Sequence, residues 1–174
     1  MPLELKAKQL VRDIPDFPTA GIIFKDITPI LLDPHAFREC IEHFCEIASE
    51  MRPNIIVAIE SRGFLFGAPM AIKLGLPLAV VRKLGKLPHK TISEEYALEY
   101  GTNTVEMHAD AINGDDNAVV VDDLLATGGT ALATARLIER LGGKVAGFCF
   151  LIELTFLPGR HTLRGYDVRS LIEY

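Results

Sequence analysis

The feature that most constrains the fold is a set of short apolar runs, rich in Val and Ile, that alternate with segments of helical character. These runs lack the polar alternation of a strand with one face in water, so each is predicted to be a strand buried on both faces of a sheet. Strands alternating with helices favour an α/β fold, with a mostly parallel central sheet flanked by helices. The predicted strands are NIIVAIE (54–60), PLAVV (77–81), AVVVDD (118–123) and KVAGFCFLIEL (144–154).

The segments before and between these strands carry helix signals. Residues 63–75 and 128–143 are predicted helices because they are apolar or amphipathic and end at glycine. Ahead of the first strand, Asp33 is a predicted N-cap, with Pro34 in the first turn of a helix that runs to residue 51.

The first 34 residues are expected to form an N-terminal arm. Residues 3–14 repeat apolar side chains at roughly helical spacing, which predicts a short helix ended by Pro15. Prolines and a glycine interrupt residues 16–34, so this stretch is predicted to be an ordered arm with at most a short strand.

The length of 174 residues predicts a single domain over 1–174. One segment departs from the strand and helix alternation, because residues 82–108 are long, polar and rich in both charges, with only their end resembling a strand. Long irregular connections in compact domains are often mobile covers of an active site. We therefore expect residues 82–108 to form a flexible lid loop.

Composition excludes several classes of protein. The formal net charge of −5 argues against a chain that binds nucleic acid through a broad basic surface. No run approaches the ~20 apolar residues of a membrane span, and the start of the chain lacks a secretory apolar region. The three cysteines have no metal-ligand spacing, and their odd number suits a reducing compartment. A cytoplasmic protein is expected.

The most informative motif is AVVVDDLLATGGT, residues 118–130. A buried strand delivers the carboxylates Asp122 and Asp123, and a loop of small and hydroxyl residues then opens a helix. Backbone N–H groups and hydroxyls at such a helix start can bind a phosphate, while two carboxylates can accept from the vicinal hydroxyls of a ribose or act through a hydrated metal ion. The predicted phosphate ligands are Ala126, Thr127, Gly128, Gly129 and Thr130.

This motif resembles the motif of type I phosphoribosyltransferases that binds phosphoribosyl pyrophosphate (PRPP). The resemblance implies that the loop holds the 5-phosphate of PRPP and that Asp122 and Asp123 bind the ribose 2- and 3-hydroxyls. The nucleotide-binding patterns GxxxxGK[ST] and GxGxxG do not occur in the sequence, so ATP hydrolysis and dinucleotide binding lose their usual support.

Two other predicted strands also end in charged residues. Arg62 follows the first strand and can bind a phosphate with two N–H groups, although a surface ion pair would explain it as well. Five potential cations follow the second strand, and alone such a run is as often a solvated surface. The resemblance implies a pyrophosphate site and a cis peptide in the loop around Arg62. The cations concerned are Arg82, Lys83, Lys86, His89 and Lys90.

Four further blocks are similar to the adenine phosphoribosyltransferase family, namely DFPTAGIIFKDITPIL, RKLGKLP, SEEYALEYG and the ELT of 153–155. This resemblance implies that adenine lies between Phe24 and Leu154, with backbone groups around Ile23 and Lys25 reading its edge. Residues 1–34 would then be the base side of the site. Lys25 departs from the family, since many relatives carry Arg at that position.

The same resemblance implies that Glu99 manages a proton of the purine ring during catalysis. It also implies a Mg²⁺ cofactor bound mainly through PRPP rather than directly by the protein, and a homodimer. The function expected is purine salvage, in which adenine and PRPP give AMP and pyrophosphate. Two alternatives stay open, namely a related enzyme for xanthine, hypoxanthine, guanine or orotate, and a non-catalytic regulator that senses PRPP.

Overall fold

The computed structural model describes residues 5–98 and 101–174. These form two compact units, one ending at His43 and the other beginning at Phe44. The division falls within helix α3 (Pro34–Met51). The single domain expected over 1–174 stays a prediction, and each unit is described by itself.

The first unit is built on a small antiparallel hairpin. The helix expected over 3–14 is wrong in its extent, because the helix ends at Leu10 and residues 12–15 form a strand. Cross-strand ion pairs explain the difference, since Arg12 pairs with Asp26 at 2.6 Å and Lys25 with Asp13 at 2.7 Å. A short helical pattern is only marginally stable without such support. The elements are α1 (Lys6–Leu10), β1 (Arg12–Pro15), β2 (Ile23–Asp26) and α2 (Thr28–Leu32).

Helix α3 begins as the sequence predicts. The side-chain oxygen of Asp33 accepts the backbone N–H groups of His35 and Ala36, each at 3.0 Å. These contacts satisfy two of the N–H groups that a helix start leaves without intrahelical partners. The predicted N-cap is confirmed.

The second unit contains a sheet with the strand order β5-β6-β4-β3-β7-β8-β9. Strands β4, β3, β7, β8 and β9 pair in parallel, whereas β5 and β6 pair antiparallel. The predicted α/β fold with a mostly parallel sheet is confirmed. All four predicted strands occur, and the edge strand β9 was not predicted. The strands are β3 (Ile55–Ile59), β4 (Leu78–Lys83), β5 (Thr91–Ala97), β6 (Thr102–His108), β7 (Asn117–Leu125), β8 (Lys144–Glu153) and β9 (Val168–Glu173).

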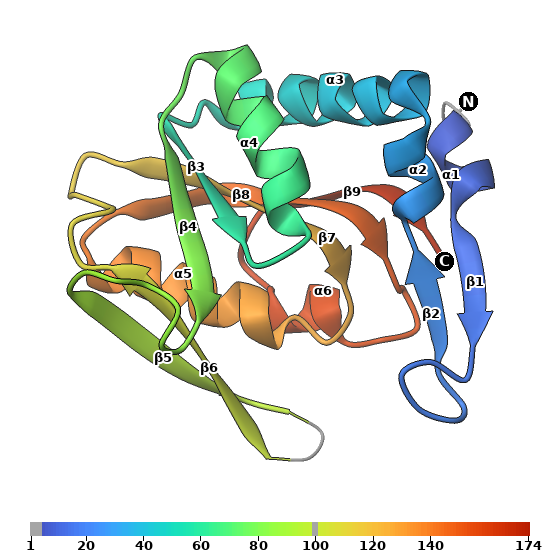
Figure 1. Cartoon of the computed structure of the whole chain (residues 1–174). Coiled ribbons are helices and arrows are strands. Elements are labelled where there is room, and N and C mark those ends of the chain that lie inside the picture. Colours follow the sequence, from blue (N-terminus) through green and yellow to red (C-terminus); the bar gives the residue numbers. More distant parts are fainter. Residues whose placement is uncertain (1–4, 99–100) are drawn as a thin grey trace. The chain divides into compact units, whose positions relative to one another are not determined.

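Helices cover both faces of this sheet (Figure 1). Helix α4 (Gly63–Leu74) packs on β3 and β7, and α5 (Gly129–Arg140) lies on the opposite face, with the short α6 (Gly159–Thr162) beside it. Close approach of α4 depends on Gly67, because a Cβ built there would lie 2.6 Å from the Cβ of Ala58. Both predicted helices are confirmed.

The segment 82–108 differs from the irregular loop that its polarity predicts. Residues 91–97 and 102–108 pair as an antiparallel hairpin, β5 with β6, and β6 extends the main sheet beside β4. The buried carboxylate of Glu106 explains part of this order, because it accepts the N–H groups of Lys86 and Leu87 and the hydroxyl of Thr91. Glu106 is therefore a buried residue that stabilises the segment, although its charge alone would predict an exposed position.

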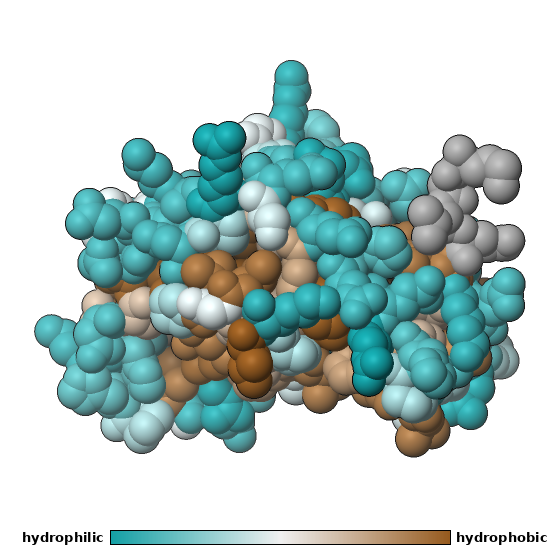
Figure 2. Space-filling model, turned by 90° about the horizontal axis from the view of Figure 1, so that it is seen from above, coloured by the Kyte–Doolittle hydropathy of each residue, from teal (hydrophilic) through white to brown (hydrophobic). Residues whose placement is uncertain are grey.

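Exposed apolar side chains also occur on helix α4 and at the start of β4 in the second unit. Helix α4 exposes Leu65 and Ile72, which are 41% and 83% exposed, and Leu78 begins β4 at 40%. Apolar side chains emerge among hydrophilic ones in the space-filling view (Figure 2). Among the described residues, no helix is both long and apolar enough to cross a membrane.

Candidate active site

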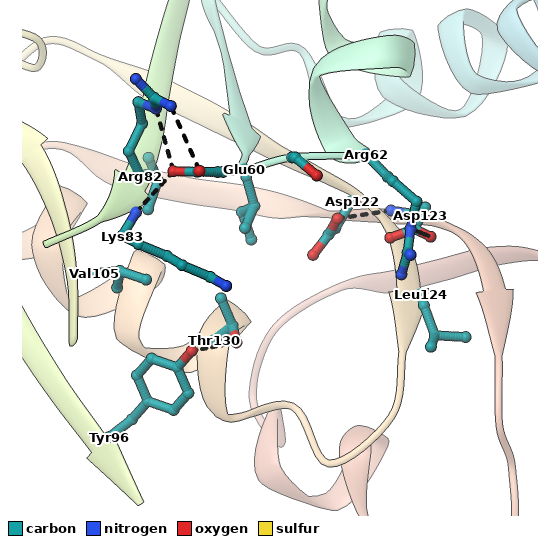
Figure 3. Close-up of a pocket in the computed structure, with 13 residues that line it drawn as sticks. Glu60, Arg62, Arg82, Lys83, Tyr96, Val105, Asp122, Asp123, Leu124 and Thr130 are labelled. Carbon is teal, nitrogen blue, oxygen red and sulfur yellow. Dashed lines mark hydrogen bonds and ion pairs between the residues drawn. The ribbon is translucent and has the colours of Figure 1, made fainter. Parts of the chain in front are cut away.

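The carboxyl ends of β3, β4 and β7 surround a cavity of about 340 Å³ (Figure 3). In open parallel sheets this edge is where ligands bind, because loops and helix starts gather there. Most of the lining is polar or charged. The lining residues are Ile59, Glu60, Ser61, Arg62, Val81, Arg82, Lys83, Tyr96, Val105, Asp122, Asp123, Leu124 and Thr130.

Asp122 and Asp123, near the end of β7, lie together on one side of this cavity. Asp123 is 5% exposed, and Arg62 donates to its carboxylate across 2.5 Å. Asp122 accepts the backbone N–H of Asp123 at 2.8 Å. Burial raises the pKa of Asp122 well above its usual value, and the neighbouring charge of Asp123 raises it further. The site therefore holds two unlike carboxylates, one of them already matched by a cation.

The loop after β7 lines a second, smaller cavity of about 90 Å³. All five predicted phosphate ligands, Ala126 to Thr130, contribute to its wall. Gly128 is the N-cap of α5 with φ +83, and a Cβ there would lie 3.0 Å from the carbonyl oxygen of Gly159. Only glycine combines this backbone conformation with that packing. The helix start can thus present its N–H groups to an anion.

Glu60 joins the ends of β3 and β4, which the sequence did not suggest. Its carboxylate accepts from the Arg82 side chain at 3.1 Å and from the Lys83 backbone N–H at 2.9 Å. Burial by itself would raise the pKa of Glu60, but these donors together hold it below its usual value. The following peptide, Glu60–Ser61, is cis, as the resemblance implied for this loop.

The predicted cations fall into two groups. Arg62, Arg82 and Lys83 all line the main cavity, and the Lys83 side chain extends toward its centre (Figure 3). Lys86 and His89 are exposed and are not among the cavity-lining residues. His89 instead lies beside His108, with ring centroids 6.0 Å apart. Lys90 is exposed as well and is not a cavity-lining residue, so the described structure brings together three of the six predicted cations.

Tyr96 is a further cavity residue that the sequence pattern did not single out. Strand β5 carries it to the start of α5, where Thr130 donates a hydrogen bond to its hydroxyl at 2.9 Å. The partners are separated by 34 residues, so no local spacing could have indicated the contact.

The predicted base-binding residues belong to different units. In the first unit, Phe24 meets the ring of Phe17 edge to face at 5.2 Å, Ile23 is 56% exposed, and Lys25 pairs with Asp13. In the second unit, Leu154 directly follows β8 and donates its N–H to the carbonyl of Leu125 at 3.0 Å. Their roles toward a base stay predictions.

Glu99, the predicted catalytic residue, lies outside the described residues. Among residues 5–98 and 101–174, no group of three or more His, Cys, Asp or Glu side chains is arranged to hold a metal ion. Asp122 and Asp123 nevertheless offer the oxygen ligands that Mg²⁺ prefers.

Comparisons with known proteins agree with this geometry. Residues 29–165 match the phosphoribosyl transferase domain family. The chain is 53% identical over 170 residues to the adenine phosphoribosyltransferase of Kosmotoga olearia, covering 98% of this chain and 100% of the relative.

Solved structures give the same result. The adenine phosphoribosyltransferase of Thermoanaerobacter pseudethanolicus superposes with a TM-score of 0.95 at 54% identity, covering 97% of this chain and 98% of that one. The enzyme of Saccharomyces cerevisiae, solved with adenine and an imino-altritol bisphosphate, gives a TM-score of 0.89 at 39% identity, with 95% and 96% covered. The chain therefore belongs to the adenine phosphoribosyltransferase family of transferase enzymes.

Proposed function

We propose that this chain transfers the phosphoribosyl group of PRPP to adenine, giving AMP and pyrophosphate in purine salvage. The observation that carries the proposal is the position of Asp122 and Asp123 directly before the loop 126–130, with Thr130 lining both cavities. The carboxylates can accept from the ribose hydroxyls, and the adjacent loop can donate to the 5-phosphate. These groups therefore lie in the same order as the hydroxyls and the phosphate of a ribose 5-phosphate.

In this proposal the 5-phosphate occupies the smaller cavity and accepts from the N–H groups of residues 126–130 and the hydroxyls of Thr127 and Thr130. The ribose 2- and 3-hydroxyls donate to Asp122 and Asp123. The contact of Arg62 with Asp123 supports a fixed acceptor, because the guanidinium group holds the carboxylate in one position.

The pyrophosphate of PRPP would lie on the opposite side of the main cavity, toward Arg82 and Lys83. Glu60 supports this assignment, since it fixes the Arg82 guanidinium and the Lys83 backbone while the Lys83 ammonium group extends into the cavity. Lys86 and His89 are proposed as further pyrophosphate ligands that act only when the segment 82–108 covers bound substrate. Lys86→Ala is then expected to weaken PRPP binding, and an unaltered affinity would remove Lys86 from the site.

Adenine is proposed to stack between Phe24 and Leu154, with backbone groups around Ile23 and Lys25 reading its Watson–Crick edge. Stacking accepts any purine, so discrimination must come from hydrogen bonds. A 6-oxopurine presents a carbonyl where adenine has an amine, and would leave a backbone carbonyl without a donor. Many relatives carry Arg at the position of Lys25. The ammonium group of Lys25 cannot bind a phosphate with two parallel N–H groups as a guanidinium does, so the affinity for a phosphate ligand changes but the reaction does not.

The chemical step joins N9 of adenine to C1′ of the ribose as the bond from C1′ to the pyrophosphate oxygen breaks. The purine ring must lose a proton as this bond forms, and Glu99 is proposed to accept it. General base help of this kind contributes roughly 10²–10⁴ in rate. As a cover of the bound substrate, the segment 82–108 would exclude water, which otherwise competes with adenine for C1′.

PRPP is proposed to bind as its Mg²⁺ complex, which lowers the negative charge of the departing pyrophosphate. Such a complex needs only one or two protein carboxylates, because substrate phosphates and water supply the other oxygen ligands. Asp122 and Asp123 would contact it through its bound water, while PRPP would supply its direct ligands. The small number of carboxylates at the cavity suits this arrangement.

The experiment that tests the function measures nucleotide formation from PRPP with each candidate base in turn. AMP from adenine is expected, with far slower product formation from hypoxanthine, guanine, xanthine and orotate. Product from another base in place of adenine would assign the chain to that base. PRPP binding without product from any base would make the chain a PRPP sensor, which its family membership does not favour.

Glu99 is tested separately. Glu99→Ala is expected to lower kcat by about 10²-fold or more while PRPP affinity persists, since the proposed role concerns proton transfer. Turnover equal to that of the unaltered enzyme would exclude Glu99 from catalysis.

We also propose a homodimer in the cytoplasm. The exposed side chains of Leu65 and Ile72, which lie seven positions apart on α4, support an apolar contact with a second copy. Light scattering should give twice the chain mass, and Ile72→Glu should lower it. The three cysteines form no disulfide in the described structure, which suits a reducing compartment.

A further inference from the structure

Tyr96 lies against the start of the helix that carries the phosphate loop. Its hydroxyl accepts a hydrogen bond from Thr130 at 2.9 Å (Figure 3). A Cβ built on Gly129 would lie 3.0 Å from Cδ2 of the Tyr96 ring. The ring thus occupies space that any other residue at position 129 would need.

Charged contacts hold the strand of Tyr96 on the same helix. Glu94, two positions earlier on β5, pairs with Arg136 at 3.3 Å and with Arg140 at 3.0 Å. Arg140 also donates to the backbone carbonyl of Ser93 at 2.7 Å. Together these contacts fix β5 along α5, so the Tyr96 hydroxyl is presented to Thr130 by an anchored strand.

Thr130 lines both the main cavity and the smaller phosphate-loop cavity, as Asp122 and Leu124 do, and of these three residues it alone carries a hydroxyl. A threonine hydroxyl has one proton to donate and two lone pairs that accept. With the site as described, this proton is directed to Tyr96. A bound phosphate only accepts, so Thr130 can bind it as a donor only if its proton turns away from Tyr96.

The Tyr96 hydroxyl can compensate for that change, since it too can donate. Once Thr130 donates to the phosphate, Tyr96 donates to the Thr130 oxygen, and the two bonds form a chain that runs from tyrosine through threonine to the anion. Chains of this kind are cooperative, because each donor is polarised by the bond it accepts. Without the Tyr96 hydroxyl, the Thr130 hydroxyl loses the partner that keeps its proton directed toward the phosphate.

We infer that Tyr96 is a positioning residue of the phosphate loop, which reverses its hydrogen bond to Thr130 when a sugar phosphate binds and so orients the Thr130 hydroxyl toward the 5-phosphate. The inference rests on the proposed function for the identity of the ligand. Its test therefore uses direct binding as well as turnover.

The main measurement is the affinity of the full chain for PRPP and for ribose 5-phosphate, by titration calorimetry, in the unaltered protein and in Tyr96→Phe. The variant keeps the ring against Gly129 and removes only the hydroxyl. Both ligands are expected to bind about 5- to 10-fold more weakly, which is the usual effect of one hydrogen bond. In turnover, KM for PRPP should rise by a similar factor, with kcat and KM for adenine within about twofold.

Tyr166→Phe is the matched control, because its hydroxyl donates to Glu139 at 2.8 Å and Tyr166 lines neither site cavity. This control is expected to bind both ligands as the unaltered protein does. A matching loss of affinity in both tyrosine variants would overturn the inference, since a general effect of removing a hydroxyl would then explain it.

A double-mutant cycle with Thr130→Val tests whether Tyr96 acts through Thr130. If it does, the double variant binds ribose 5-phosphate no more weakly than Thr130→Val alone. Additive losses, or unchanged affinity in Tyr96→Phe, would overturn the inference even if the enzyme makes AMP. Weaker ribose 5-phosphate binding in Tyr96→Phe, with no AMP formed by the unaltered protein, would support the inference and defeat the proposed reaction.

Discussion

Arg62 donates to the Asp123 carboxylate across 2.5 Å, and this contact joins the loop after β3 to the acidic end of β7. The two residues are 61 positions apart in the chain. Because the Asp123 side chain is buried, the guanidinium of Arg62 fixes the position of its carboxylate beside the cavity. The pair therefore contributes to the fold as well as to the site.

Arg62→Ala should destabilise the protein by about 1–2 kcal/mol, because it leaves the Asp123 carboxylate without its cation. The full cost of an unpaired buried charge is not expected, since the Arg62 side chain is 40% exposed and water reaches the site. Urea denaturation measures the change. Arg169→Ala is the control, because Arg169 pairs with the more exposed carboxylates of Asp167 and Glu50, and it should cost under about 0.5 kcal/mol. Equal losses in the two variants would contradict this account.

Asp122→Asn should stabilise the ligand-free protein at neutral pH and weaken its binding of ribose 5-phosphate at least about tenfold. The raised pKa means that ionising Asp122 costs the folded state free energy at pH values above that pKa, and the amide removes this cost. The stability difference should begin to shrink as pH falls through the raised pKa and should vanish near the ordinary value of 3.8, because the unfolded state is then protonated as well. Thermal denaturation across this range checks the stability, and calorimetry checks the affinity. A less stable variant at neutral pH would refute the assignment of Asp122 as the costly carboxylate.

Glu106→Gln should destabilise the protein by about 1–3 kcal/mol at neutral pH, because the charge-assisted bonds to Lys86, Leu87 and Thr91 are weakened. Burial alone would raise the pKa of Glu106, but the backbone N–H donors hold it below its usual value of 4.5. The stabilisation by the ionised form is therefore present above the ordinary pKa and is lost as pH falls through the lowered one. Denaturation at neutral and acid pH should show the difference between the proteins shrinking in acid. Glu95→Gln, on the exposed side of β5, is the control and should change little.

Gly67→Ala should cost about 1–3 kcal/mol, although alanine favours a helix by up to about 1 kcal/mol. The added Cβ would lie 2.6 Å from the Cβ of Ala58, so α4 must move away from β3. Gly114→Ala is the matched control, because its Cβ would meet nothing nearer than 3.9 Å. Thermal denaturation should separate the two variants clearly, and a neutral Gly67→Ala would show that α4 adapts without loss.

Sequence reasoning located the strands and the motif because both depend on local chemistry. Runs such as residues 55–59 are apolar on both faces of the strand, and only a sheet covered on both faces accommodates them. The small residues 126–130 predict a helix start that can bind an anion, because this property depends on local backbone N–H groups rather than on distant contacts. Segments with mixed polarity were harder, since the strands over 12–15 and 91–97 were missed and only the end of residues 82–108 was expected to resemble a strand. Their pairing depends on other segments, since β6 pairs with Arg82 and Lys83 of β4, and β1 pairs with β2 at Asp26.

The sequence by itself determined the class of fold, the carboxylates that face the ribose in our proposal and the loop that faces the phosphate, because those features follow from residues adjacent in the chain. Only the tertiary structure decided which distant groups act together. It paired Arg62 with Asp123, Arg82 with Glu60, and Tyr96 with Thr130. The physical reason is that strand order brings the ends of β3, β4 and β7 to one edge, and a one-dimensional pattern carries no information on which charges then meet.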